Sequence, residues 1–193
     1  NPARMPAVIY AAEEGNISIA LAGDVILNRP LSHYREPGFL RVREILTGAD
    51  AAIGNLESLY HNWEMPYGSI YTAAYQVGRP EMLEEVKWLG FGGMGVAMNH
   101  SFDCGEAGLL ATLDNCRARG IPLAGAGRDL GEARSPAWVE TPVGRIAVMS
   151  AATTFALTNV VHAGPGRHDM PGKPGISMLR HDTVNHVPAA EFE

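Results

Sequence analysis

Residues 17–24 read ISIALAGD, an apolar run that ends in a glycine and a carboxylate. The small apolar side chains of this run predict a buried strand that ends at Gly23-Asp24. Two further apolar runs, at residues 51–54 and 92–98, also lead directly into polar turns. The polar residues of the three turns are Asp24, Asn55, Glu57, Asn99, His100 and Asp103. Because ligands of open α/β sheets bind outside the carboxyl ends of the strands, we expect these side chains to meet around one site.

Helical patterns alternate with these runs. Apolar residues share one face of residues 38–46, of residues 80–90 and of residues 106–119, so each segment is predicted to form a helix. Residues 137–140 and 145–151 flank a turn sequence and predict a hairpin. The βαβαβ order of the first half places the chain in the α/β class.

Three segments follow from this pattern. Residues 1–16 are expected to form an irregular lead-in and residues 17–152 the folded core. Glycine and proline punctuate residues 153–193, which are expected to be rich in loops and to lead towards a missing C-terminal half. The open edge of the predicted sheet would need that half, or a second chain, to complete the fold.

The composition excludes some classes of partner. The chain has 193 residues, 46% of them hydrophobic, which suits one ordinary domain or most of a larger one. Its formal net charge is −6 and its lysines and arginines are scattered, so nucleic acid is not expected as a partner. No apolar run approaches the length of a membrane span. Both an extracellular or cell-surface location and a cytoplasmic one stay open.

Each polar turn has a chemical and a structural interpretation. Gly23 permits close approach of a ligand to the Asp24 carboxylate, but an Asp after a strand also starts ordinary turns. Asn55 and Glu57 point to the same side of an extended backbone and are able to address one ligand together. Asp103 is a candidate for acid–base chemistry with His100, or for the cap of the helix that follows.

Oxygen ligands with one imidazole suit a divalent metal such as manganese, iron, zinc or magnesium. Such an ion lowers the pKa of bound water and so generates a nucleophile, and it needs about three or four of these groups. Residues 125–128 end in Arg128 and either cradle an anion or form a tight turn. A long loop is expected between residues 60 and 75, and its aromatic residues either line a substrate groove or anchor the loop. These aromatic residues are Trp63, Tyr67, Tyr71 and Tyr75.

Several strings resemble the CapA family, the poly-γ-glutamate capsule biosynthesis proteins of the calcineurin-like metallophosphatase superfamily. The strings are AGDVIL at 22–27, GNLES at 54–58, GRPE at 78–81, AMNHSFDCGEAGL at 97–109 and GIPLAGAGR at 120–128. Glu132-Ala133-Arg134 and Pro136 follow in the same order. The resemblance covers most of residues 17–151 and is more specific than any single motif.

The resemblance implies the N-terminal portion of a metallophosphatase-like α/β/β/α sandwich. It implies metal or substrate contacts for Asp24, Glu57 and Asn99, and an acid–base role for His100. With Asp103 as a second catalytic residue and Asn55 and Arg128 as substrate contacts, these residues form the predicted site.

Two departures from the family pattern bear on the metal. Ile26 stands where many metallophosphatases carry a metal-binding histidine, and Met98 replaces the first residue of the common Asn-Asn-His string. The later histidine strings of the family, His-Trp-Gly and Gly-His-x-His, have no counterpart before Glu193. A complete two-metal centre is therefore not expected from this chain, and a site without any divalent metal is the alternative.

Three functions are compatible with this pattern. The first is metal-assisted hydrolysis or transfer on an amide-linked or phosphorylated anionic polymer, and it is the one we favour. The second is epimerisation of a peptide without metal, for which some CapA-like proteins provide the precedent. The third is a non-catalytic component of polymer synthesis or export. The expected partner in each case is an anionic polymer or peptide.

Overall fold

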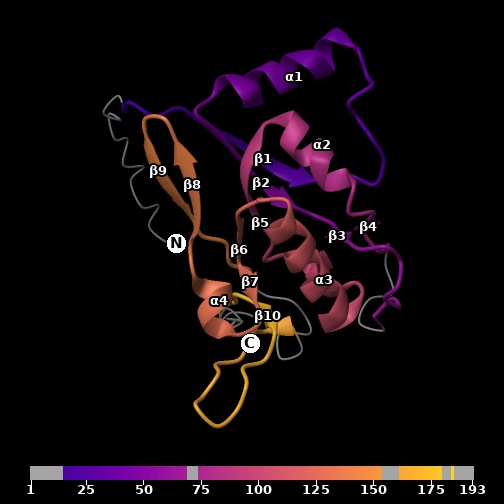
Figure 1. Ribbon diagram of the computed structural model, residues 1–193, viewed down its shortest axis with the longest axis vertical. Coiled ribbons are helices and arrows are strands. Elements are labelled where there is room, and N and C mark those ends of the chain that lie inside the picture. Colours follow the sequence, from indigo (N-terminus) through magenta and orange to yellow (C-terminus); the bar gives the residue numbers. More distant parts are fainter. Residues whose placement is uncertain (1–14, 69–73, 154–160, 180–183, 185–193) are drawn as a thin grey trace, which may run out of the picture.

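The computed structural model describes residues 15–68, 74–153, 161–179 and 184, and the fold is seen in Figure 1. Most of the predicted lead-in, Tyr71 and most of the chain beyond residue 179 lie outside the described residues. The strands of the central sheet are β1 (Ile19–Val25), β2 (Ala51–Leu56), β5 (Phe91–Gly95) and β6 (Leu123–Ala124). The helices are α1 (Pro37–Gly48), α2 (Met82–Leu89), the 3-10 helix η1 (Asn99–Phe102), α3 (Gly105–Ala118) and α4 (Leu130–Arg134). The shorter strands are β3 (Leu59–Tyr60), β4 (Val77–Gly78), β7 (Ala126–Gly127) and β10 (Gly175–Ile176), and β8 (Ala137–Thr141) and β9 (Gly144–Val148) form the predicted hairpin.

The four central strands are parallel and follow the order β1-β2-β5-β6. A parallel connection needs a crossover, and α1, α2 and α3 provide the three crossovers of this sheet. The carboxyl ends of all four strands therefore lie at the same edge. The predicted α/β class with a central parallel sheet is confirmed.

The two faces of the sheet are covered by different elements. Ala52 and Leu56 of β2 face α1, α2 and α3 and pack in one apolar cluster with Leu46 and Val86. The alternate residues of β2 face the β8–β9 hairpin, where Ile53 packs against a cluster that contains Val139. Figure 1 shows the helices and the hairpin on opposite sides of the sheet. The described chain thus has helix, sheet and hairpin layers, consistent with an α/β metallophosphatase-like fold.

Local signals account for the ends of α2. Pro80 precedes the helix, where the missing N–H of proline costs nothing, and Glu84 and Glu85 lie in the first turn. Gly90 ends the helix in the left-handed conformation, with φ of 104°, and its N–H bonds to the carbonyl groups of the last turn. The helix predicted from this pattern is confirmed.

The short strands β3, β4 and β10 form pairings that the sequence pattern did not indicate. β3 and β4 pair in parallel at the two ends of the segment that was expected to be a long loop. β10 pairs antiparallel with β7, so residues 161–179 return to the carboxyl edge of the sheet. No helix within the described ranges is long and apolar enough to cross a membrane.

Candidate functional site

The Asp24 carboxylate owes its position to an irregularity in β1. Leu21 pairs with Ile53, but Asp24 rather than Gly23 pairs with Asn55, so β1 contains one extra residue opposite β2. Such a bulge changes the direction in which the following side chains point. As a result, the side chain of Asp24 lies on the same side as that of Asn55, and the two are hydrogen-bonded.

Asn55 joins two carboxyl groups. Its Nδ2 donates to Asp24 Oδ1 at 2.9 Å and to Glu57 Oε2. Asp24 is exposed, whereas Glu57 is only 8% exposed. Burial raises the pKa of the Glu57 carboxyl above its ordinary value, and the negative charge of Asp24 raises it further. The Glu57 carboxyl therefore holds its proton to a higher pH than an exposed glutamate does.

The turn after β5 is built by unusual caps. Met98 precedes η1, and its Sδ accepts a hydrogen bond from the His100 N–H at 3.0 Å. Ser101 Oγ accepts from the Met98 N–H at 3.2 Å and donates to the Val96 carbonyl. These contacts fix the backbone on both sides of His100 and direct its imidazole.

His100 and Asp103 form a hydrogen-bonded pair. The distance between His100 Nδ1 and Asp103 Oδ2 is 2.8 Å, and the same oxygen accepts from the Gln76 N–H at 2.6 Å. Burial raises the pKa of Asp103, while these two partners lower it. Asp103 is 1% exposed, and its Oδ1 is buried without a partner among the described residues. Asp103 does not cap α3, whose cap residue is Cys104 without a side-chain bond.

The side chains form two hydrogen-bonded groups. Asp24, Asn55 and Glu57 make up one, and His100 and Asp103 make up the other. A charged His100 would lower the pKa of Glu57, so the imidazole lies within electrostatic range of that carboxyl. That the two groups act on one ligand stays a prediction. Asn99, in contrast, is exposed, and the structure gives it no contact with the carboxyl pair.

The residues present supply only part of a metal site. Asp24 and Glu57 offer carboxylate oxygens, but the Asn55 amide nitrogen binds both of them. Across residues 15–68, 74–153 and 161–179, no group of three or more His, Cys, Asp or Glu side chains is arranged to hold an ion. A divalent ion at Asp24, Glu57 and Asn99 would therefore need further ligands from outside these ranges.

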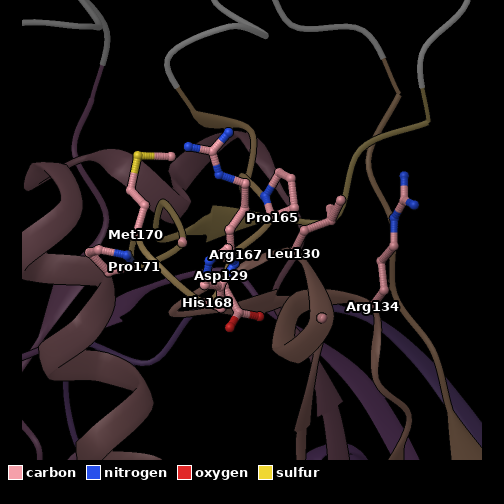
Figure 2. Close-up of a pocket in the computed structure, with 11 residues that line it drawn as sticks. Asp129, Leu130, Arg134, Pro165, Arg167, His168, Met170 and Pro171 are labelled. Carbon is pink, nitrogen blue, oxygen red and sulfur yellow. The ribbon is translucent and has the colours of Figure 1, made fainter.

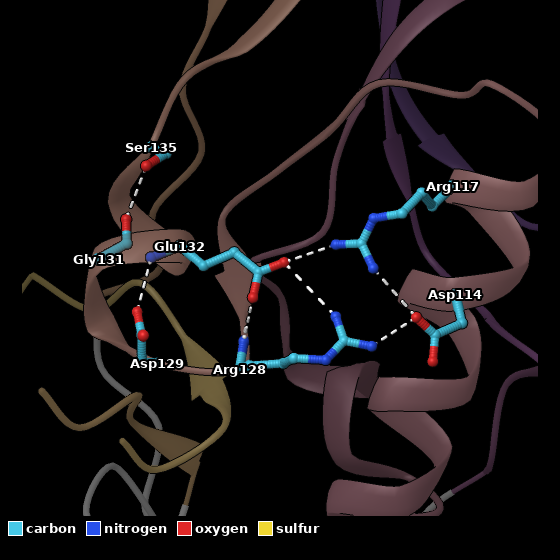
Figure 3. Close-up of polar contacts among 7 residues, drawn as sticks. All are labelled: Asp114, Arg117, Arg128, Asp129, Gly131, Glu132 and Ser135. Carbon is cyan, nitrogen blue, oxygen red and sulfur yellow. Dashed lines mark hydrogen bonds and ion pairs between the residues drawn. The ribbon is translucent and has the colours of Figure 1, made fainter. Parts of the chain in front are cut away.

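Arg128 belongs to a network of ion pairs between α3 and α4 (Figure 3). Its guanidinium pairs with Asp114 and Glu132, and Arg117 pairs with the same two acids. The hydrogen bond to Asp114 raises the pKa of Arg128. Gly125, with φ of 102°, forms the tight turn between β6 and β7 that was one of the two interpretations of this segment. The substrate contact predicted for Arg128 stays a prediction.

The aromatic residues of the segment between β3 and β4 gather in one group. The rings of Tyr67 and Tyr75 stack with centroids 4.4 Å apart, and Trp63 meets Tyr67 edge-on at 6.5 Å. Trp63 and Tyr67 are about half exposed, at 50% and 53%. Tyr75 Oη donates to the Gly68 carbonyl at 3.0 Å, so the group stabilises its own loop while it presents two rings to solvent.

Residues 18–189 match the family described as bacterial capsule synthesis protein PGA_cap. The chain belongs to this family. The match confirms the resemblance to CapA proteins and covers all the residues of the site. This family is described as one of bacterial capsule synthesis.

Two curated relatives of this chain come from Sinorhizobium fredii (strain NBRC 101917 / NGR234). They are the uncharacterized proteins y4sH and y4uA, each 36% identical to this chain over 166 residues. The alignment covers 84% of this chain and 36% of each relative. The chain thus spans about a third of the length of these relatives.

Two residues next to the predicted site residues were missed by sequence reasoning. Gln76 contributes only its backbone N–H to Asp103, which no side-chain pattern reveals. Ser150, which follows β9, belongs to none of the sequence motifs. Its Oγ nevertheless accepts a hydrogen bond from the Ala97 N–H at 3.3 Å and lies against Gly95 and Gly125. The glycines at these two strand ends were the available signal, since a Cβ at either position would lie within 3 Å of Ser150.

Proposed function

We propose that this chain carries the acid–base site of a capsule-synthesis enzyme that hydrolyses or transfers amide bonds of an anionic polymer. The observations that support the proposal are the buried Glu57 carboxyl, whose pKa is raised, and the His100 imidazole, which hydrogen-bonds to the buried carboxyl of Asp103. Acid–base catalysis needs one group that gives a proton and one that takes it. Burial of Glu57 suits it to give the proton, and the hydrogen bond to Asp103 suits His100 to take one.

The roles follow from the hydrogen bonds. Asp103 accepts from His100 Nδ1, so the other ring nitrogen, Nε2, is left to take a proton from an attacking water or hydroxyl group. Glu57, with its raised pKa, then gives its proton to the nitrogen of the leaving amide. Asn55 holds Glu57 and Asp24 in fixed positions, and Asp24 stays at the exposed mouth of the site.

A divalent metal is a separate proposal. When bound, such an ion would polarise the amide carbonyl, with Asp24, Glu57 and Asn99 as its contacts on this chain. The described residues do not complete its ligand shell. A Glu57 carboxylate that binds the ion has lost its proton, so this proposal is an alternative to the proton-donor role given above for Glu57.

The test uses purified chain and poly-γ-glutamate, with cleavage followed by polymer length and by new amino groups. We expect Glu57→Gln and His100→Gln each to lower the rate by about a hundredfold or more, the usual worth of a general acid or base. Glu64→Gln, an exposed carboxylate outside the pair, is the matched control and should leave the rate unchanged. Elemental analysis and a chelator arm report separately on metal. Equal rates for all variants would contradict the proposed roles.

Peptide epimerisation is the second candidate, because the same pair of groups suits removal and return of a proton at a peptide α-carbon. The hydrogen-bonded His100–Asp103 pair and the protonated Glu57 would act as base and acid. Deuterium uptake from heavy water into a peptide, without chain cleavage, would favour this reaction over hydrolysis.

A further inference from the structure

A pocket separate from the strand-end site lies between α4 and the loop that leads into β10 (Figure 2). It has a volume of about 750 Å³. Residues 129–131 and Arg134 form one wall, and residues 165–172 form the other. β7 and α4 follow β6 directly, so the pocket lies beyond the carboxyl end of the last strand of the sheet, at the same edge as His100.

The loop that forms the second wall is held in place by its backbone. Gly164 and Lys173 exchange two hydrogen bonds, at 2.9 and 3.2 Å, and Arg167 and Met170 exchange another two. The Gly164 carbonyl also accepts from the Leu130 N–H at 3.0 Å, which ties the loop to α4. The loop is therefore a fixed wall of the pocket.

The close packing of the two walls depends on a glycine. A Cβ at Gly172 would lie 2.2 Å from the Cβ of Asp129, so only glycine lets the loop approach this closely. Asp129 is also the cap of α4, and its Oδ1 accepts from the Glu132 N–H at 2.8 Å. Its carboxylate is thus partly used inside the protein.

The charged side chains around the pocket favour anions. Arg134, Arg167 and His168 are all exposed and line the pocket. Arg167 pairs with Asp169 at 3.2 Å, but both side chains are more than half exposed, so this pair is weak and exchangeable. No carboxylate of the described residues forms an ion pair with Arg134. Figure 2 shows the Arg134 and Arg167 side chains on either side of Leu130 and Pro165.

Part of the lining is apolar. Leu130 and Pro165 lie between the two arginines in Figure 2, and Met170 and Pro171 lie on the other side of Arg167. These four side chains suit the methylene groups of a ligand. The pocket thus matches a chain in which carboxylates are separated by short apolar stretches. A guanidinium binds a carboxylate through two parallel hydrogen bonds, and two guanidinium groups from different elements are able to hold two carboxylates of one chain.

We infer that this pocket is a binding site for a polycarboxylate chain, held by Arg134 and Arg167 through its carboxylates and by the apolar lining through its methylene groups. The inference rests on the proposed function, because it takes the anionic polymer as the ligand. It adds a second contact region that holds the polymer away from the reacting bond.

The test measures binding rather than turnover, so its failure is distinguishable from failure of the proposed chemistry. A short, fluorescently labelled oligomer of γ-linked glutamate is titrated with the 193-residue chain at low salt, and anisotropy is recorded. We expect the Arg134→Gln, Arg167→Gln double variant to bind the oligomer at least about tenfold more weakly, because each substitution removes a charge-assisted contact.

The matched control is the Arg41→Gln, Arg145→Gln double variant. This variant also loses two positive charges, but from arginines outside the pocket. Like Arg167, Arg41 and Arg145 form exposed ion pairs, and 72% and 59% of their side chains are exposed. Equal weakening in both double variants would show general attraction by charge and would overturn the inference, as would no binding by the wild type. Equal affinity for polyphosphate would overturn the assignment to carboxylates. Circular dichroism of each variant checks the fold, and His168→Ala gives a second, milder weakening.

Discussion

At the scale of single residues, the site depends on polar groups that satisfy one another. Asn55 donates to both carboxyl groups, and Asp103 accepts from His100 and Gln76, so each charged group is held by at least one neutral partner. The cost of this arrangement is the burial of two carboxyl groups, Glu57 and Asp103, whose pKa values are both raised. Burial of that kind links the stability of the fold to pH.

The stability of the protein should fall as pH rises above the ordinary carboxyl range. Glu57 has an ordinary pKa of 4.5, and the folded state holds its proton to a higher pH than the unfolded state does. The free energy of unfolding is then highest below the ordinary value and decreases until the pH passes the raised pKa of the folded state. Glu57→Gln removes this loss and should flatten the profile in part, with Asp103 responsible for the remaining slope.

Urea unfolding at a series of pH values from acid to neutral measures the effect. Glu84→Gln, which changes an exposed carboxylate of α2, is the control and should follow the wild-type profile. Parallel plots of unfolding free energy against pH for the wild type and Glu57→Gln would show that burial does not raise the pKa of Glu57.

At the scale of elements, the sequence was informative where the pattern was long. The strands β1 and β2 and the helix ended by Gly90 were predictable, because apolar periodicity and capping residues act locally. The predicted burial of β1 was wrong, since most of its residues are exposed. The bulge in β1 was not predictable, because it arises from pairing with β2 and decides which residue opposes Asn55. The two-residue strands β3 and β4 are too short to show a period, so only tertiary contacts reveal them.

The approach of the hairpin to the sheet depends on glycine in β5. A Cβ at Gly93 would lie 2.6 Å from Val139 Cγ2 of β8, so Gly93→Ala should destabilise the protein by about 1–3 kcal/mol through overpacking. Gly38→Ala, in α1 with no heavy atom within 4 Å of the new Cβ, should instead stabilise by about 0.5–1 kcal/mol. Denaturant unfolding of both variants gives the comparison.

A third variant separates steric overlap from other effects of the added methyl group. The Gly93→Ala, Val139→Ala double variant shortens the neighbouring side chain. Gly93→Ala should therefore lower the free energy of unfolding by less in the Val139→Ala background than in the wild type. Additive losses in the double variant would show that contact with Val139 is not the cause.

At the scale of the whole molecule, the hairpin covers only part of its face of the sheet. It packs on β5, where Val139 and Val148 meet the strand glycines, whereas Ile19 and Leu21 of the edge strand β1 are 46% and 79% exposed. An exposed apolar edge strand offers unpaired backbone groups and a hydrophobic surface at once. These two side chains of β1 are therefore exposed in the described part of the chain.

The uncovered edge predicts self-association of the 193-residue chain. Leu21→Lys places a charge on the exposed edge strand β1. Association would bury that charge, so the variant should shift the chain towards monomer. Val42→Lys is the matched control, since Val42 of α1 is 53% exposed but lies on a helix that offers no unpaired strand. Sedimentation velocity over a range of concentrations reports the association state of all three proteins. An equal shift in both variants would assign the effect to net charge, and a wild-type chain that stays monomeric throughout would show that the β1 edge is protected without a partner.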